Sequence, residues 1–184
     1  MNWYSPIIEA FIIDMEEIGI NIDESSVRFS GFWSQGDGAS FEFDAGDCDN
    51  EKFIKFLIET QGLKLPNVVM PDGTVSAESV ETLCELTGEI SIGRFMKEYA
   101  ESFLIFSERN SSRYFHEHSC QMVADFDYYR GTEDAAANRN FDQWCEEIEA
   151  VSERWRIREC KSLFRKLEKW YEESGQADID NEEE

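Results

Sequence analysis

The sequence predicts an α+β domain in which a small antiparallel sheet packs against helices and a long helical region closes the chain. Three observations support this class. Two strand-like runs flank a glycine-containing turn in residues 27–44, apolar residues recur every three or four positions in residues 141–170, and 14% of the 184 residues are aromatic. A 41% hydrophobic content is enough for one buried core. We expect a single domain over residues 1–174 and an acidic flexible tail over residues 175–184.

The first predicted element is a helix that begins near Ser5 and ends at Gly19. Ser5 can cap this helix and Pro6 suits its first position, while glycine favours a helix end. The apolar residues of the segment share one face because they are three and four positions apart: Ile8, Phe11, Ile12, Met15 and Ile18.

Residues 27–44 predict a β-hairpin. Residues 27–34 form a strand with aromatic side chains on both faces, and residues 39–44 alternate apolar and polar side chains. The glycines in residues 35–38 permit the tight turn between them. Because this turn contains no lysine and joins two strands, it does not match a phosphate-binding P-loop.

A second helix is predicted over residues 50–61. Asp49 or Asn50 can accept hydrogen bonds from its first turn, and Gly62 can end it. Residues 63–70 are short and are expected to be extended.

The region from residue 71 to residue 126 gives a less uniform pattern. A turn is expected at residues 71–73 and a short helix at residues 76–86. From residue 92 the apolar spacing fits a helix that includes Phe103 and Phe106, whereas residues 89–94 also alternate as a strand would, and both interpretations stay open. Residues 114–126 predict a long strand that joins the hairpin in the sheet.

The longest element is predicted between residues 141 and 170. Its apolar positions step by three and four, with a phase shift near Arg158: Phe141, Trp144, Ile148, Val151, Trp155, Leu163, Leu167 and Trp170. One helix of about 30 residues or two helices in tandem would both explain the pattern. We expect the apolar stripe to face the core.

The charge is the most unusual property of the composition. The chain has 17 Lys and Arg against 40 Asp and Glu, which gives a net charge of −23. Such a protein is repelled by nucleic acid and by anionic membranes and is attracted to basic surfaces. The densest basic stretch, residues 154–169, is interleaved with acidic residues and does not form a continuous phosphate-binding track.

A cytosolic protein is expected from three further features. No run approaches the roughly 20 apolar residues of a membrane span, and the first residues lack the basic segment of a signal peptide. The five cysteines contain no CxxC pair and are expected to be reduced thiols: Cys48, Cys84, Cys120, Cys145 and Cys160.

Residues 29–41 have the sequence FSGFWSQGDGASF. This segment resembles a near-identical hairpin in a family of small proteins of tailed bacteriophages and prophages, and residues 114–119 and 164–173 are also similar to that family. The resemblance implies a phage or prophage origin and therefore the host cell cytoplasm as the location. Some members of the family are labelled antitoxin-like, and the resemblance implies no catalytic residues.

The side chains that could bind metal form weak patterns. His116, His118 and Cys120 fall on one face of the predicted strand, where residues two apart are about 7 Å from each other, but no third ligand is placed beside the two histidines. Four carboxylates near residue 48 fail the EF-hand spacing: Asp44, Asp47, Asp49 and Glu51. Helix capping by Asp49, with Glu51 favoured by the helix dipole, explains them more simply. We expect no metal, no cofactor and no enzymatic activity, and a metal-dependent enzyme remains the third alternative.

The function expected from these features is that of a phage-encoded acidic inhibitor of a host defence or DNA-processing protein. Carboxylates on a long helix can imitate phosphates, as in an anti-restriction or anti-CRISPR DNA mimic, and the partner would be a protein with a basic surface. The expected contact carboxylates are Glu146, Glu147, Glu149 and Glu153. The alternative is an antitoxin-like or other interaction module that docks through apolar contacts of Phe32 and Trp33 or of the long helix. The oligomeric state is left open.

Overall fold

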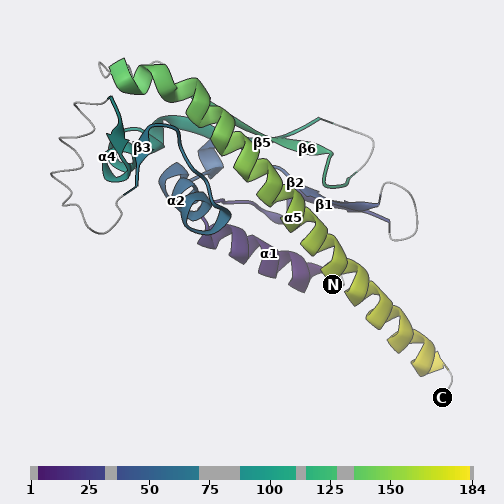
Figure 1. Ribbon diagram of the computed structural model, residues 1–184. Coiled ribbons are helices and arrows are strands. Elements are labelled where there is room, and N and C mark those ends of the chain that lie inside the picture. Colours follow the sequence, from purple (N-terminus) through teal and green to yellow (C-terminus); the bar gives the residue numbers. More distant parts are fainter. Residues whose placement is uncertain (1–3, 32–36, 71–87, 111–114, 128–134, 183–184) are drawn as a thin grey trace.

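The computed structural model confirms the mixed helix and strand class (Figure 1) and describes residues 4–31, 37–70, 88–110, 115–127 and 135–182. Its helices and strands are, in chain order, α1 (Ser5–Glu17), β1 (Val27–Ser30), β2 (Gly38–Phe41), α2 (Asn50–Gln61), β3 (Val68–Val69), β4 (Ile90–Ser91), α4 (Ile92–Glu98), β5 (Phe103–Arg109), β6 (Cys120–Phe126) and α5 (Ala135–Glu182). Side chains of α5 are described from Asn140 to Ser174. The predicted turn at residues 71–73 and helix at 76–86 lie outside these ranges.

The helix boundaries follow local chemistry. Asp49 is the N-cap of α2, and its carboxylate accepts a hydrogen bond from the Lys52 amide at 3.0 Å. Gly62 ends the same helix in the left-handed conformation, with φ of 73°. In α1 the N-cap is Tyr4, so the expected cap at Ser5 is wrong, although Pro6 lies in the first turn as expected.

The predicted hairpin is present as β1 and β2, which pair antiparallel from Val27 opposite Phe41 to Ser30 opposite Gly38. A second hairpin pairs β5 with β6, from Phe103 opposite Phe126 to Arg109 opposite Cys120. An antiparallel bridge joins the two: the Phe43 amide donates to the Ser107 carbonyl at 3.3 Å, and the Ser107 amide donates back at 3.0 Å.

Two expectations in this region are wrong. The strand predicted over residues 114–126 begins only at Cys120, and its ladder partner is β5. Phe103 and Phe106 lie in β5 rather than in a helix, because α4 ends at Glu98. Phe103 and Phe106 are three residues apart, which also fits a helix. In β5 the strict alternation of apolar and polar residues is broken because Leu104 is apolar although it is exposed.

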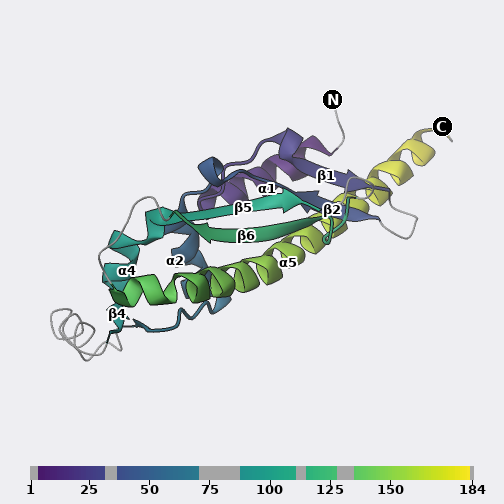
Figure 2. The same cartoon turned by 90° about the horizontal axis from the view of Figure 1, so that it is seen from above.

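α5 is a single helix, which decides between the two alternatives for residues 141–170, and its backbone stays helical through Glu182. It lies across the strands, chiefly against β6 and β2, and its C-terminal part projects beyond the rest of the fold in both views (Figures 1 and 2). The backbone of residues 175–182 is helical, and the flexibility expected of residues 175–184 stays a prediction. In the described chain, no helix is both long enough and apolar enough to span a membrane.

The apolar stripe of α5 forms the centre of the core from Phe141 to Leu167, as expected, whereas Trp170 is 36% exposed. Trp155 is buried against Phe41 and Phe53, with ring centroids 5.9 and 5.2 Å away. Trp144 is fully buried beside Phe95, and its indole nitrogen donates to the Pro66 carbonyl at 2.7 Å. Because one rigid helix is fastened to α2, α4 and both hairpins, its outward-facing side chains hold fixed positions relative to the whole fold.

Candidate functional site

One face of α5 carries a line of carboxylates. Asp142, Glu146, Glu149 and Glu153 are spaced by four, three and four residues, which places them on the same side of the helix. The first three are exposed, and so is Asp125 on the adjoining strand β6. We call Asp125, Asp142, Glu146 and Glu149 the acidic stripe. Residues 141–153 contain no basic residue.

The negative charge of this stripe acts on the thiol of Cys145. Burial raises the pKa of Cys145 to about 12, and the charges of Asp125, Asp142 and Glu149 contribute to the rise. Three carboxylates from two different elements therefore act on one atom. A negative potential of this kind attracts a cationic partner and disfavours an anionic one.

Glu153 belongs to the fold rather than to the acidic stripe. Its Oε2 accepts hydrogen bonds from the Met122 amide at 3.0 Å and from Arg156 Nε at 2.9 Å, and its Oε1 accepts from Arg156 Nη2 at 2.7 Å. Arg156 is fully buried, and the same Nη2 donates to the carbonyls of Glu117 at 2.7 Å and Cys120 at 2.6 Å. Glu153 is thus committed to an internal ion pair.

The four carboxylates expected at the contact surface therefore do not form one common surface. Glu146 and Glu149 lie in the acidic stripe, and neither forms an ion pair with another residue of the described ranges. Glu147 is exposed but lies about 100° around the helix from Glu146. Sequence reasoning missed Asp142, although it stands four residues before Glu146, and missed Asp125, which only the tertiary structure brings close. Phe32 and Trp33 lie outside the described residues.

The two histidines do not form the expected strand arrangement. Residues 115–119 make a turn in which the His118 amide donates to His116 Nδ1 at 3.0 Å and the His116 amide donates to Ser119 Oγ at 3.0 Å. Cys120 is buried at the start of β6. Across the ranges that the structure describes, no three His, Cys, Asp or Glu side chains are grouped to hold a metal ion.

The carboxylates around residue 48 act as caps. Asp49 caps α2, and Asp44 and Asp47 form a reciprocal capping box around a 3-10 turn, Ala45–Asp47. These contacts confirm the capping interpretation of Asp49.

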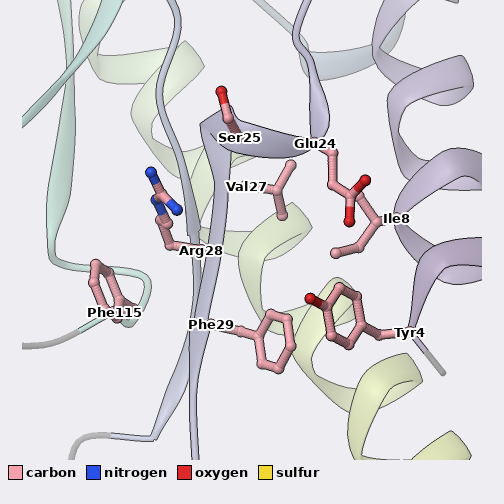
Figure 3. A pocket seen from close by; sticks show the side chains of 8 residues that line it. All are labelled: Tyr4, Ile8, Glu24, Ser25, Val27, Arg28, Phe29 and Phe115. Atoms are coloured by element: carbon pink, nitrogen blue, oxygen red, sulfur yellow. The ribbon is translucent and has the colours of Figure 1, made fainter. Parts of the chain in front are cut away.

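A pocket of about 570 Å³ lies beside β1 (Figure 3). Tyr4, Val27 and Phe29 lie on one side of the strand, where the Tyr4 and Phe29 rings meet edge to face at 5.1 Å. Arg28 extends to the other side, toward Phe115. The two charged groups of the pocket, Glu24 and Arg28, therefore lie on opposite sides of β1 and do not converge on a common ligand atom.

The fold and the acidic stripe define a small α+β protein with a carboxylate-rich helical surface. The chain belongs to a family described as a domain of unknown function (DUF8835), whose model matches residues 3–176. No curated protein and no solved structure matches the chain.

Proposed function

We propose that the protein is a phage-encoded acidic inhibitor that binds a basic surface of a host defence or DNA-processing protein in the cytoplasm of the host cell, as a mimic of DNA. The observation that carries the proposal is the acidic stripe, in which carboxylates from α5 and β6 are exposed side by side. The net charge of −23 and the phage-like segment at residues 29–41 support it.

The backbone that bears the stripe is rigid, as this role requires. The helix that bears three of the four carboxylates is anchored by the buried Trp144, Ile148 and Val151. Because the charges are held in place before binding, little ordering entropy is lost when a cationic groove meets them.

The stripe also favours a protein partner over other ligands. Nucleic acid and anionic membranes would bring further negative charge to a surface that already holds several exposed carboxylates. A groove lined by Lys and Arg gains favourable contacts and releases its own counterions. We therefore propose a non-catalytic protein–protein interaction.

The experiment begins with a pull-down from bacterial lysate at low and high salt, with mass spectrometry to identify the bound protein. Binding is then compared for two variants that each remove four charges. One neutralises the acidic stripe (Asp125→Asn, Asp142→Asn, Glu146→Gln, Glu149→Gln). The control neutralises exposed carboxylates of α1 (Glu9→Gln, Asp14→Asn, Glu16→Gln, Glu17→Gln).

The stripe variant is expected to lose about 2–4 kcal/mol of binding free energy, since each exposed carboxylate contributes up to about 1 kcal/mol. Wild-type affinity should fall steeply with salt, and the control variant should keep most of its affinity. An unchanged affinity in the stripe variant with a flat salt response would refute mimicry and favour apolar docking through Phe32 and Trp33. Equal losses in both variants would show that net charge alone drives binding.

A further inference from the structure

The outer face of the β5–β6 hairpin carries apolar side chains. Leu104, Phe106 and Glu108 alternate with the buried residues of β5, so they share the face that points away from the core. In the ladder, Leu104 lies opposite Asp125 and Phe106 lies opposite Val123. Leu104 is 41% exposed, and Phe106 and Val123 are half-buried. We call Leu104, Phe106 and Val123 the outer strip.

On one side, the outer strip is continuous with the acidic stripe. Residues directly opposite each other in an antiparallel pair have Cβ atoms about 4.5–5.5 Å apart, so the carboxylate of Asp125 lies beside Leu104. Asp125 is itself part of the acidic stripe. The other members of the stripe come from α5, which packs along β6 with β5 on the opposite side of that strand (Figure 2).

On the other side, the outer strip ends at a second group of carboxylates. A pocket of about 410 Å³ lies between β5 and residues 42–47, and Phe106 is one of its lining residues. Arg109 also lines this pocket and forms an ion pair with Glu42 at 2.9 Å. The carboxylates that line it are Glu42, Asp44, Asp47 and Glu108. The three apolar side chains therefore lie between two acidic borders.

This arrangement has the anatomy of a protein interface, with an apolar centre and a charged rim. Because acidic residues dominate both borders, the rim complements a cationic partner. A second copy of the chain would bring like charges together, so self-association through this face is unfavourable. A partner that supplied cations alone would gain nothing from the apolar centre.

We propose that the partner meets this surface with an aromatic side chain surrounded by Lys or Arg, so that the ring packs on the outer strip while the cations reach the carboxylates on both sides. This inference rests on the proposed function, since it names the chemistry of the partner that binds the acidic stripe. Aromatic rings supply a large apolar contact area. Grooves that hold single-stranded nucleic acid combine basic residues with aromatic platforms for the bases, and a protein that fills such a groove needs apolar surface beside its carboxylates.

The test uses two peptides of equal charge as probes, acetyl-Lys-Lys-Trp-Lys-Lys-amide and acetyl-Lys-Lys-Gly-Lys-Lys-amide. Each is titrated into the isotope-labelled full chain in about 0.15 M salt and followed by NMR. We expect the Trp peptide to bind at least about fivefold more tightly than the Gly peptide and to shift the amide signals of β5 and β6.

The variant Leu104→Gln/Val123→Thr keeps every carboxylate and removes apolar surface from the outer strip. It should abolish the advantage of the Trp peptide and leave the affinity of the Gly peptide unchanged. The control Ile13→Gln alters an apolar residue of α1 that is 56% exposed, and it should keep the full advantage. Circular dichroism verifies folding, and Leu104→Gln alone at its exposed position gives the same comparison if the double variant unfolds.

Neutralising the acidic stripe separates this inference from the proposed function. That variant should weaken both peptides by the same factor, because the two carry the same charge, and should keep the preference for Trp. Equal affinities of the two peptides for the wild type overturn the inference, as do a preference that survives Leu104→Gln/Val123→Thr and shifts that lie outside β5 and β6. If neutralising the stripe leaves both affinities unchanged, the proposed function fails instead.

Discussion

Glu153 binds the guanidinium of Arg156 through both carboxylate oxygens, at 2.9 Å to Nε and 2.7 Å to Nη2. Although burial by itself lowers the pKa of Arg156, the hydrogen bond and charge of Glu153 raise it above its ordinary value, so the buried side chain stays charged. The pair connects α5 to the start of β6, since Glu153 also accepts from the Met122 amide. Glu153 thus stabilises the fold rather than binding a partner, although it lies on an acidic helix.

Arg156→Ala should destabilise the protein by about 3–5 kcal/mol, because it leaves Glu153 and the carbonyls of Glu117 and Cys120 without their donor. Urea unfolding followed by circular dichroism measures the change. Arg154→Ala, at an exposed position of the same helix, is the control and should cost within about 0.5 kcal/mol. Similar midpoints for the two variants would show that the buried ion pair contributes nothing to stability.

Gly38→Ala should destabilise the fold by about 1–3 kcal/mol through overpacking. A Cβ atom at Gly38 would lie 2.7 Å from the Cβ of His116 and 2.8 Å from its Cα, and both belong to the turn before β6. Gly46→Ala is the matched control, since a Cβ there meets nothing within 4 Å. Thermal melts of the two variants give the comparison, and equal melting temperatures would mean that the turn moves away without cost.

Glu159→Gln should stabilise the protein at neutral pH. Burial raises the pKa of Glu159 above its ordinary 4.5, Arg158 and Lys166 lower it, and Asp14 raises it again. A carboxyl whose pKa is higher in the folded state supports folding below pH 4.5 and loses that contribution as pH rises through the raised value. The melting temperature of the variant should therefore exceed that of the wild type at pH 7 and match it at pH 4. A lower melting temperature at pH 7 would contradict the direction of the shift.

Most of α1, α2 and α5 was predictable from sequence because the signals for these helices are local. The cap at Asp49, the stop at Gly62 and the stepped apolar residues of α5 each act within a few residues of one another. The β5–β6 pairing was not, because Phe103 and Phe106 fit either period and only their pairing with Phe126 and Val123 decides between them.

The candidate site was only partly predictable for the same reason. The spacing of Glu146 and Glu149 shows a charged helix face. The proximity of Asp125 to the other carboxylates of the stripe, however, depends on how β6 packs against α5. The ion pair of Glu153 depends on which arginine of α5 becomes buried. Sequence periodicity does not distinguish Arg154, which is exposed, from Arg156, which is not.

Deleting residues 176–184 should leave the thermal transition of the protein unchanged. This segment begins nine positions after Leu167, the last buried residue among the described side chains of α5, so its loss removes none of the described core contacts. The melt is followed by circular dichroism. A large drop in melting temperature would show that the segment packs on the domain.

Cys145 should react slowly with iodoacetamide in the native protein. Alkylation requires the thiolate, and a pKa of about 12 instead of 9.0 lowers the thiolate fraction about 1,000-fold at pH 8. Neutralising Asp125, Asp142 and Glu149 with Asn, Asn and Gln should speed the reaction at Cys145, because their charges oppose formation of a second anion beside them. The rate at Cys48 should not change, since burial and Asp49 raise its pKa to about 12 independently of the stripe. Mass spectrometry of peptides after timed alkylation gives both rates in one sample. If the triple variant leaves the Cys145 rate at the wild-type value, burial alone protects the thiol, and the acidic stripe does not generate the negative potential on which binding of a basic partner depends.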